Sequence, residues 1–366
     1  MSQPSPLKPQ PRPGILDVAP YVGGESKAEG ANRVIRLASN ENPLGPSAKA
    51  IAAYEAEKGN LHRYPDGGAL ALRRALAEAE GLDAERIVCG AGSDELIALL
   101  VRAYAGPGDE VLYSEHGFLM YGISARTAGA TAVSAPEVAL TADVDGLLSR
   151  VTDKTRLLFL ANPNNPTGSY ISEAALRRLH AGLPSSVLLV IDAAYAEYVT
   201  AADYPRPAAL VEEAGNVVML RTFSKIYGLA ALRLGWAYAP AAVVDVLNRV
   251  RGPFNVSQAA QAAGLAAIAD KDHVAQSVAH NAKWRSWFSE VAAKAGVEPL
   301  PSAGNFILLR FPGGQAEAEG VLADLKARGI LVRGVGAYGL ANCLRVTIGT
   351  EDEMRATAEA LQAVLG

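Results

Sequence analysis

Residues 187–192 have the sequence Val187-Leu188-Leu189-Val190-Ile191-Asp192, an apolar run that ends on a carboxylate. A run that is apolar at every position predicts a strand buried on both faces, as in a parallel sheet covered by helices. Similar runs occur at 86–89, 110–113, 155–160, 216–221 and 234–238, with helical patterns such as 94–104, 172–181 and 241–250 between most of them. The sequence therefore predicts an α/β protein with a mostly parallel central sheet.

The pattern changes after Pro253, which suggests a second domain. Residues 257–295 are almost wholly helical in pattern, and short strands are predicted at 305–311, 330–333 and 344–348. A length of 366 residues corresponds to roughly two domains. We predict an N-terminal arm over 1–45 that packs with the small domain, a large domain over 46–255 and a smaller α/β domain over 256–366. The first 14 residues contain five prolines, so we expect them to be flexible.

Charge and composition exclude several classes of protein. Lys and Arg total 34 and Asp and Glu total 38, a net charge of −4, which argues against a nucleic-acid-binding surface. The two cysteines and five histidines lack metal-ligand spacing, so we predict no metal site. No apolar run is long enough to cross a bilayer, and the first residues lack the apolar segment of a signal peptide. We therefore expect a cytoplasmic protein.

The segment Arg221-Thr222-Phe223-Ser224-Lys225 follows a predicted strand, and Arg233 lies eight residues further on. A lysine held in a low-polarity site loses its proton readily and can attack an aldehyde cofactor. The hydroxyls of Thr222 and Ser224 and the guanidinium of Arg233 suit a phosphate group. The same five residues also fit a surface lysine in a turn.

Asp192 and Tyr195 follow the apolar strand that opens this section. The carboxyl end of such a strand is where open α/β sheets bind ligands. A carboxylate there could keep the ring nitrogen of pyridoxal phosphate protonated, and Tyr195 could donate to the phenolic oxygen of the cofactor. The alternative is that Asp192 is the N-cap of a helix.

Two further turns contain candidate cofactor ligands. Residues 162–168, Asn-Pro-Asn-Asn-Pro-Thr-Gly, predict a rigid turn that aims an amide into a site or is simply a tight turn. Residues 90–94, Gly-Ala-Gly-Ser-Asp, lie between a strand and a helix, where backbone N–H groups can approach a phosphate. Glu95 stands where a dinucleotide-binding motif would have its last glycine, so that motif is not predicted.

Arg345 lies inside the apolar strand 344–348. A buried guanidinium is costly without a partner, and a substrate carboxylate or phosphate is a suitable one. An internal acid beside an edge strand is the alternative partner. The partner of Arg333 is likewise either a substrate anion or an internal acid.

Together and in this order, these segments resemble a fold-type I, pyridoxal-phosphate-dependent aminotransferase, and most closely the histidinol-phosphate aminotransferase family. The resemblance covers nearly the whole chain and includes the segments 20–24, 39–46, 63–66 and 118–121. It implies a pyridoxal 5'-phosphate cofactor and a homodimer.

The resemblance also assigns roles to residues. The implied catalytic residues are Lys225, which forms an aldimine with the cofactor and moves the proton, Asp192 on the pyridine nitrogen and Tyr195 on the phenolic oxygen. The other implied cofactor contacts are Gly92, Ser93, Asp94, Phe118, Asn165, Thr222, Ser224, Arg233 and, from the neighbouring subunit, Tyr64. The implied substrate-binding residues are Tyr21, Asn42, Arg333 and Arg345, with Arg345 on the carboxylate of glutamate and Arg333 and Tyr21 on a substrate phosphate.

The expected reaction is transamination of histidinol phosphate with 2-oxoglutarate, which gives imidazole-acetol phosphate and glutamate in histidine biosynthesis. Alternatives within the same fold are an aromatic amino-acid (phenylalanine) aminotransferase and a lyase similar to threonine-phosphate decarboxylase. One departure from the family pattern is Glu115-His116-Gly117-Phe118, where many members have Pro-Thr before the aromatic residue. We interpret His116 as a local loop residue.

Overall fold

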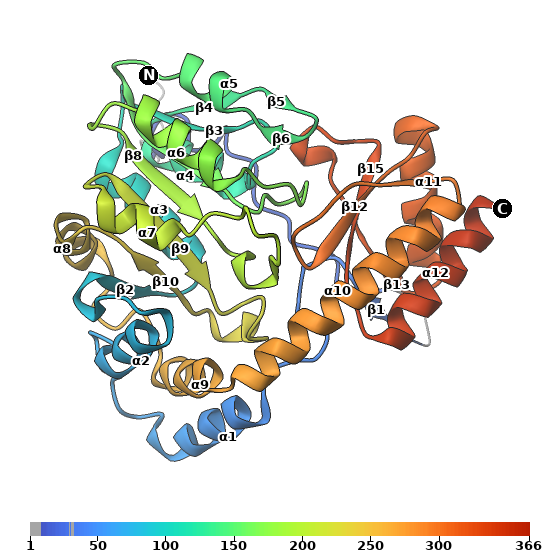
Figure 1. The fold of residues 1–366 in the computed structure, drawn as a ribbon, viewed down its shortest axis with the longest axis horizontal. Coiled ribbons are helices and arrows are strands. Elements are labelled where there is room, and N and C mark those ends of the chain that lie inside the picture. The colour runs from blue at the N-terminus through green and yellow to red at the C-terminus, as the bar shows by residue number, and fades with distance from the viewer. Residues whose placement is uncertain (1–8, 29, 31–32) are drawn as a thin grey trace, which may run out of the picture.

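The computed structural model describes residues 9–28, 30 and 33–366, so part of the predicted arm (1–8, 29, 31 and 32) lies outside the described residues. A seven-stranded sheet forms the centre of the large domain (Figure 1). Its strands, in spatial order, are β2 (Ile87–Gly90), β10 (Gly235–Tyr238), β9 (Val217–Thr222), β8 (Leu188–Asp192), β7 (Thr155–Ala161), β3 (Glu110–Ser114) and β4 (Thr131–Ala135).

The predicted mostly parallel sheet is confirmed. Strands β9, β8, β7, β3 and β4 are parallel, whereas β10 is antiparallel to both of its neighbours. The carboxyl ends of β8 and β9 are adjacent, with Asp192 paired to Leu220. Strand β4 was not predicted, because its sequence, Thr-Ala-Val-Ser-Ala, is only partly buried at the sheet edge and lacks an apolar run.

Helices cover both faces of this sheet, which explains the uninterrupted apolar runs in its central strands. Leu189 and Ile191 pack in one core and Leu188 and Val190 in the other, as expected when successive side chains point to opposite faces. The first core includes residues of α2 (Leu70–Glu80), α5 (Val144–Ser149), α6 (Glu173–Gly182), α7 (Pro207–Glu213) and α9 (Gln258–Ala269). The second includes residues of α3 (Ser93–Tyr104), α4 (Leu119–Ala128) and α8 (Ala241–Val250).

Local sequence signals fix where several helices begin. Ser47 caps α1 (Ala48–Ala56) by accepting a hydrogen bond from the Ala50 N–H. The Asp66 carboxylate accepts from the N–H groups of Gly68 and Leu70 at the start of α2. Within the described part of the chain, no helix is long and apolar enough to cross a membrane.

The small domain has its own sheet and core. An antiparallel sheet contains, in order, β11 (Glu298–Pro299), β12 (Phe306–Arg310), β15 (Cys343–Thr347) and β14 (Arg333–Gly334). Helices α11 (Gly314–Ala327) and α12 (Glu351–Leu365) pack in the same core as Ile307 and Val346. The single strand predicted at 330–333 is two short strands, because β13 (Ile330–Leu331) pairs with β1 (Ile35–Arg36) rather than with β15.

The core divides within helix α10 (Lys271–Lys294), not at the predicted boundary between residues 255 and 256. Val274 and Val278 of α10 pack on the large-domain core, whereas Trp284 and Phe288 pack in the small-domain core. Helix α9 belongs to the large domain because its small residues allow close packing; a Cβ at Gly264 would lie 2.5 Å from Leu234. The long helix crosses between the two domains (Figure 1).

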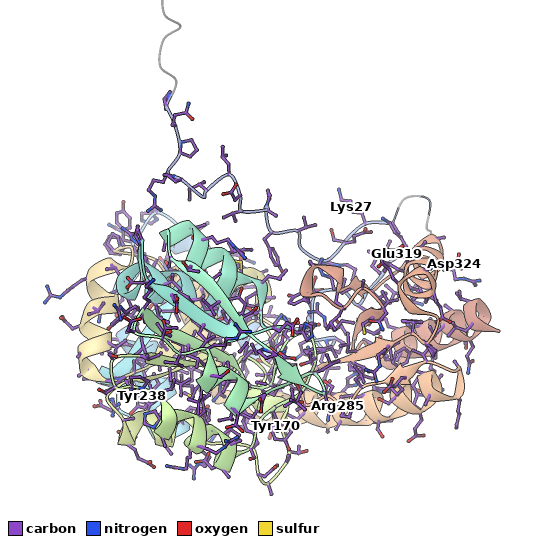
Figure 2. The ribbon with its side chains drawn as sticks, turned by 90° about the horizontal axis from the view of Figure 1, so that it is seen from above. Lys27, Tyr170, Tyr238, Arg285, Glu319 and Asp324 are labelled. Atoms are coloured by element: carbon purple, nitrogen blue, oxygen red, sulfur yellow. The ribbon has the colours of Figure 1, made fainter. Side chains whose placement is uncertain are left out.

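The described part of the N-terminal segment connects the domains. Figure 2 shows it running from the large domain toward the small one, with Lys27 near the small-domain end. Glu25 pairs with Lys326 of α11 at 2.7 Å, and β1 adds a parallel strand beside β13. Residues 37–42 then enter the space between the two domains, where Ala38, Ser39 and Asn40 line the polar cavity described below.

Candidate active site

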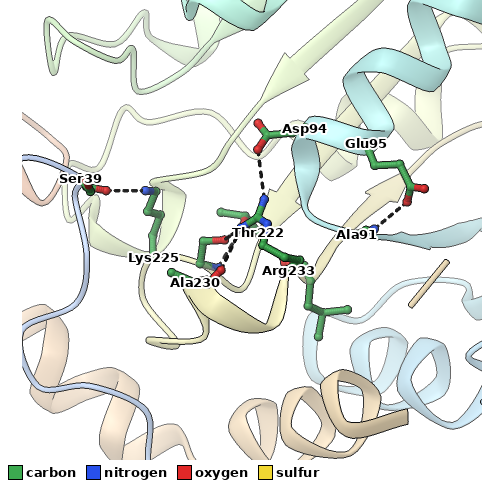
Figure 3. A network of polar contacts seen from close by, with 10 residues as sticks. Ser39, Ala91, Asp94, Glu95, Thr222, Lys225, Ala230 and Arg233 are labelled. Atoms are coloured by element: carbon green, nitrogen blue, oxygen red, sulfur yellow. Dashed lines mark hydrogen bonds and ion pairs between the residues drawn. The ribbon is translucent and has the colours of Figure 1, made fainter. Parts of the chain in front are cut away.

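Lys225 follows the carboxyl end of β9 and lies on the wall of a cavity between the domains. The Thr222 hydroxyl accepts a hydrogen bond from the Ser224 N–H at 3.1 Å, which closes the turn that presents Lys225. The Lys225 Nζ donates to the Ser39 carbonyl at 3.1 Å (Figure 3). Burial, together with the positive charge of Arg345, lowers the pKa of Lys225 to about 8. A substantial fraction of this amine is therefore neutral near neutral pH.

Asp192 ends the adjacent strand β8 and is buried. Its Oδ2 accepts a hydrogen bond of 2.8 Å from the Tyr121 hydroxyl, whereas its buried Oδ1 has no hydrogen-bond partner among the described residues. Burial raises the pKa of Asp192 to about 6, although the Tyr121 hydrogen bond opposes this shift. Asp192 is not the N-cap of a helix, because the next helical turn, η3 (Ala196–Tyr198), begins four residues later. The free oxygen is available to a cationic or N–H group in the cavity.

Tyr121 was not among the predicted site residues. It lies in the first turn of α4, is fully buried and stacks on Phe159 of β7. Its place in the segment Phe118-Leu119-Met120-Tyr121 was noted, but nothing in the spacing shows that its hydroxyl meets a carboxylate 71 positions away. Its phenol stays protonated because burial and the nearby carboxylate raise its pKa.

Polar groups around Arg233 form a cradle at the start of helix α3. Arg233 donates to Asp94 Oδ2 at 3.1 Å, to the Ala230 carbonyl at 2.9 Å and to Ser224 Oγ at 3.3 Å (Figure 3). Ser93 begins the twelve-residue helix α3, so the unpaired N–H groups of its first turn lie beside this cradle. The half-exposed Arg233 has a φ of 51°, a strained value that persists only where the surroundings hold it.

Glycines keep this cradle open. Gly92 has a φ of 85°, and a Cβ there would overlap the Arg233 guanidinium. A Cβ at Gly235 would lie 2.5 Å from the Ser93 nitrogen. The Glu95 carboxylate, which takes the place of a third glycine, accepts from the Ala91 N–H at 2.6 Å and so fixes the loop (Figure 3). The cradle therefore offers N–H, hydroxyl and guanidinium donors, the set that binds phosphate.

Arg345 lies on β15 and reaches the cavity from the small domain. Its guanidinium donates to the Asn165 side-chain oxygen and, at 2.7 Å, to the Ala38 carbonyl, and its buried Nε has no partner. Among the described residues it makes no ion pair, so the alternative of an internal acid is wrong. Burial lowers the pKa of Arg345, because its charge lacks a compensating carboxylate. Such a cation favours an anionic ligand.

Tyr195 and Asn165 are both near Arg345 and Lys225. The Tyr195 hydroxyl accepts a hydrogen bond from the Asn40 side chain at 2.9 Å, and burial raises the pKa of Tyr195. The Lys225 Nζ lies 5.9 Å from the centre of the Tyr195 ring. The Asn165 amide oxygen accepts a hydrogen bond from Arg345, and its NH₂ group is available to a ligand.

Arg333 is a second cation at the same cavity. It lies on β14, directly opposite Arg345 of β15 in the sheet register. It donates to the carbonyls of Gly23 and Val22 at 2.6 and 2.7 Å. Tyr21 packs edge-on against Phe118, with ring centroids 6.5 Å apart. The N-terminal segment thus lies across this side of the cavity.

The structure brings most of the predicted site residues together around one cavity of about 290 Å³. Those that line it are Tyr21, Ser93, Asp94, Phe118, Asn165, Asp192, Tyr195, Thr222, Ser224, Lys225, Arg233, Arg333 and Arg345. Further lining residues, to which no role was assigned from sequence, include Ala38, Ser39, Asn40, Glu41 and Tyr338.

Asn42 was predicted to bind substrate, and the structure places it elsewhere. Its side-chain nitrogen donates to the Ile226 carbonyl at 2.7 Å and to Ser277 at 3.0 Å, and its oxygen accepts from the Leu44 N–H. The buried amide is therefore satisfied within the protein and does not line the cavity. Asn42 instead supports the loop that follows Lys225.

Tyr64 also lies outside this cavity. Its side chain is 81% exposed and stacks on Phe254, with ring centroids 4.5 Å apart. An exposed aromatic pair of this kind is a common feature of a protein–protein interface. The predicted contact of Tyr64 with the site of a neighbouring subunit remains a prediction.

Comparisons with known proteins are consistent with this geometry. The profile of the family "Aminotransferase class I and II" matches residues 32–361. The chain is 56% identical over 360 residues to the histidinol-phosphate aminotransferase of Paramagnetospirillum magneticum, covering 98% of this chain and 99% of that protein. It is 58% identical over 353 residues to the histidinol-phosphate aminotransferase of Rhodospirillum centenum, covering 96% and 98% of the two chains.

Solved structures are similar along the whole chain. The histidinol-phosphate aminotransferase of Sinorhizobium meliloti, solved in complex with pyridoxal-5'-phosphate, has a TM-score of 0.91 and 30% identity, covering 98% of each chain. An aspartate aminotransferase of Thermus thermophilus has a TM-score of 0.82 at 20% identity and covers 92% of each chain, which shows the shared fold. The chain belongs to the class I and II aminotransferase family and, within it, to the histidinol-phosphate aminotransferases.

Proposed function

We propose that this chain transfers the amino group of histidinol phosphate to 2-oxoglutarate, with pyridoxal 5'-phosphate as cofactor, to give imidazole-acetol phosphate and glutamate. The observation that carries the proposal is the convergence of Arg345 and Arg333 on the cavity that also holds Lys225 and Asp192. The identity of 53–58% to histidinol-phosphate aminotransferases over nearly the full length supports the choice of substrate.

The residues of the cavity fit the cofactor. The buried, unpartnered Asp192 Oδ1 suits the N–H of a pyridinium ring. The cradle of Ser93, Thr222, Ser224 and Arg233 suits a phosphate, and two glycines leave room for it. We infer that Lys225 holds the cofactor covalently through Nζ, that Phe118 packs on the ring and that the Asn165 NH₂ and Tyr195 hydroxyl contact its phenolic oxygen.

When bound, pyridoxal phosphate supplies an aldehyde carbon that takes up the substrate nitrogen and a cationic ring that delocalises negative charge. Asp192 would keep that ring cationic, because an ionised carboxylate stabilises a proton on the ring nitrogen. As a free amine, Lys225 has a lowered pKa that suits it to accept a proton near neutral pH. Its Nζ would carry the proton from the substrate Cα to the cofactor carbon.

The two arginines divide the binding of the two substrates. Arg345, which has no acidic partner among the described residues, binds the carboxylate of glutamate through its guanidinium fork. Arg333 and Tyr21 bind the phosphate of histidinol phosphate. Arg333 then exchanges its bonds to the Val22 and Gly23 carbonyls for bonds to a charged oxygen, which are stronger.

Steady-state kinetics with the purified protein test the substrate. We expect kcat/KM for histidinol phosphate to exceed that for phenylalanine by at least a hundredfold, because a phenyl group leaves Arg333 without its anion. A larger kcat/KM for phenylalanine would instead identify an aromatic amino-acid aminotransferase. Release of CO₂ from threonine phosphate without a 2-oxo acid would identify a lyase.

We also propose that the protein is a homodimer in which Tyr64 contacts the phosphate of the partner's cofactor. Exposed apolar side chains on and near helices α1 and α9 support this, among them Tyr54, Leu61, Phe254 and Leu265. Mixed dimers of Lys225→Ala and Tyr64→Ala chains test it. If Tyr64 acts across the interface, each mixed dimer has one intact site and activity returns; if Tyr64 acts within its own chain, activity stays at the level of the variants.

The expected cytoplasmic location is part of the same proposal. Cys89 and Cys343 are buried free thiols, which is usual in a reducing compartment.

A further inference from the structure

His116 lies where three segments that carry site residues meet. It belongs to the loop between β3 and α4, two residues before Phe118, and is 9% exposed. Its carbonyl accepts a hydrogen bond of 3.1 Å from the side chain of Asn164, the neighbour of Asn165. Its N–H donates to the Glu137 carboxylate at 3.2 Å. The backbone of His116 is thus fixed to the large domain on both sides.

The imidazole of His116 reaches across to the small domain. Its Nδ1 lies 2.7 Å from the carbonyl oxygen of Tyr338, and because a carbonyl only accepts, Nδ1 carries the proton. Tyr338 ends the turn η5 (Gly336–Tyr338), which directly follows β14 and Arg333. The Tyr338 side chain lines the cavity beside Arg345 and Arg333. One hydrogen bond therefore connects the loop of Phe118 with the small-domain turn beside Arg333.

Packing on both sides of this bond makes it a defined contact between domains. Tyr338 is 5% exposed and shares a small apolar cluster with Val335 and Leu308, against which Leu119 and Leu140 of the large domain pack. A hydrogen bond is directional, so this bond selects one position of the turn where the apolar contacts of the cluster alone would permit several.

We propose that His116 is a positioning residue: its hydrogen bond to Tyr338 holds the small-domain turn and Arg333 in the arrangement that binds the anionic end of the amino donor. The inference rests on the proposed function in taking Arg333 as a substrate contact. His116 does not touch the reacting atoms. When the bond is lost, only part of the population has the turn in place, and the apparent affinity for substrate falls by that fraction.

The expected signature is a change in affinity without a change in the chemical step. Substrate binding restores the arrangement, so a saturated variant reacts at the wild-type rate. The test is the half-reaction of the holoenzyme with the amino donor, followed by stopped-flow absorbance, which separates the apparent dissociation constant from the limiting rate. For His116→Leu we expect the dissociation constant to rise about three- to tenfold, which is what one hydrogen bond contributes to an equilibrium constant, with the limiting rate unchanged.

Two further variants distinguish positioning from general stability. His116→Asn places an amide N–H close to the position of Nδ1 and should restore the wild-type dissociation constant. His280→Leu is the matched control, because the His280 Nε2 lies 2.8 Å from the Gly349 carbonyl oxygen and makes the same kind of bond. Neither His280 nor Gly349 lines the cavity. It should lose thermal stability and leave the dissociation constant unchanged.

Several results would overturn the inference. These are a wild-type dissociation constant in His116→Leu, an equal rise in His280→Leu, a fall in the limiting rate alone, or failure of His116→Asn to restore affinity. If His116→Leu does not fold, His116→Gln, whose amide reaches the Nε2 position instead, replaces it with the same expectation. A wild-type enzyme that does not react with histidinol phosphate would refute the proposed function, whereas a reactive wild-type enzyme with an unchanged dissociation constant in His116→Leu would refute the role of His116 alone.

Discussion

Replacing Tyr121 with Phe tests whether its hydroxyl keeps Asp192 ionised for the cofactor. The hydroxyl donates to Asp192 Oδ2 at 2.8 Å, and the other oxygen has no partner within the described residues. A hydrogen bond to a charged group contributes about 1.5–3 kcal/mol. Because one pH unit corresponds to 1.36 kcal/mol, removing this bond should shift the ionisation of Asp192 to higher pH by about one to two pH units.

The magnitude of the effect depends on pH. The pKa of Asp192 is about 6 before substitution, so the fraction of protein molecules with an ionised Asp192 decreases as the pH falls. A cation binds at Oδ1 only when Asp192 is ionised, so its apparent affinity decreases with that fraction. We expect Tyr121→Phe to weaken binding of pyridoxal phosphate about 5- to 50-fold at pH 6, about 2- to 10-fold at pH 7 and hardly at all at pH 9. The effect vanishes at high pH because Asp192 is then ionised in both proteins.

Fluorescence titration of the apo-protein with pyridoxal phosphate from pH 6 to 9 measures this ratio. Tyr113→Phe is the control, since the Tyr113 ring lies 6.2 Å from that of Tyr121 but its hydroxyl does not bond to Asp192. A ratio that stays constant across this range would show that the loss comes from packing and would refute the reasoning. So would a Tyr113→Phe protein with the same pH dependence.

Three further outcomes are expected. The rate at which the apo-protein takes up pyridoxal phosphate covalently should rise with pH through about 8, where half of Lys225 is neutral, and level off by about pH 9. A rate in stopped-flow absorbance that still rises tenfold between pH 9 and pH 10 would contradict this expectation. Arg345→Leu should lower kcat/KM for glutamate by about 10- to 100-fold while cofactor affinity stays unchanged, and unaltered glutamate kinetics would remove Arg345 from substrate binding. Gly92→Ala should lower cofactor affinity at least tenfold by displacing Arg233. The control is Gly81→Ala, at a φ of 69° with no atom near its Cβ, which should lower thermal stability alone. Equal cofactor affinities of these two variants in equilibrium dialysis would contradict this.

The sequence predicted the central sheet well because its signal is local. The central strands β7, β8 and β9 each contain an uninterrupted apolar run, and alternate residues of that run pack on the two faces of the sheet. Burial on both sides can therefore be predicted from a few consecutive residues. The residues that follow β8 and β9 were predicted to form the site for the same reason. Two parallel neighbouring strands deliver Asp192 and the Lys225 turn to one edge of the sheet.

The domain boundary could not be predicted in this way. The change of pattern after Pro253 was real, but α9 is rich in alanine and resembles a helix of either domain. Its membership depends on which surface it meets, and Gly264 fits against Leu234 of the large domain. Likewise, the motif around Asn42 marks a site segment, yet its amide turns to Ile226 and Ser277, while neighbouring Asn40 contacts Tyr195.

By itself, the sequence determined the layered α/β fold and the candidate lysine, aspartate and arginines. Hydrophobic periodicity and strand ends can be recognised from consecutive residues. Only the tertiary structure decided which polar groups meet: Tyr121 with Asp192, Asn165 with Arg345 and His116 with Tyr338, which are 71, 180 and 222 positions apart. A hydrogen bond requires its donor and acceptor to lie within about 3.2 Å. Spacing along the chain does not give such distances, because they are set only when the chain has folded: within the large domain for Tyr121 and Asp192, and between the two domains for the other two pairs.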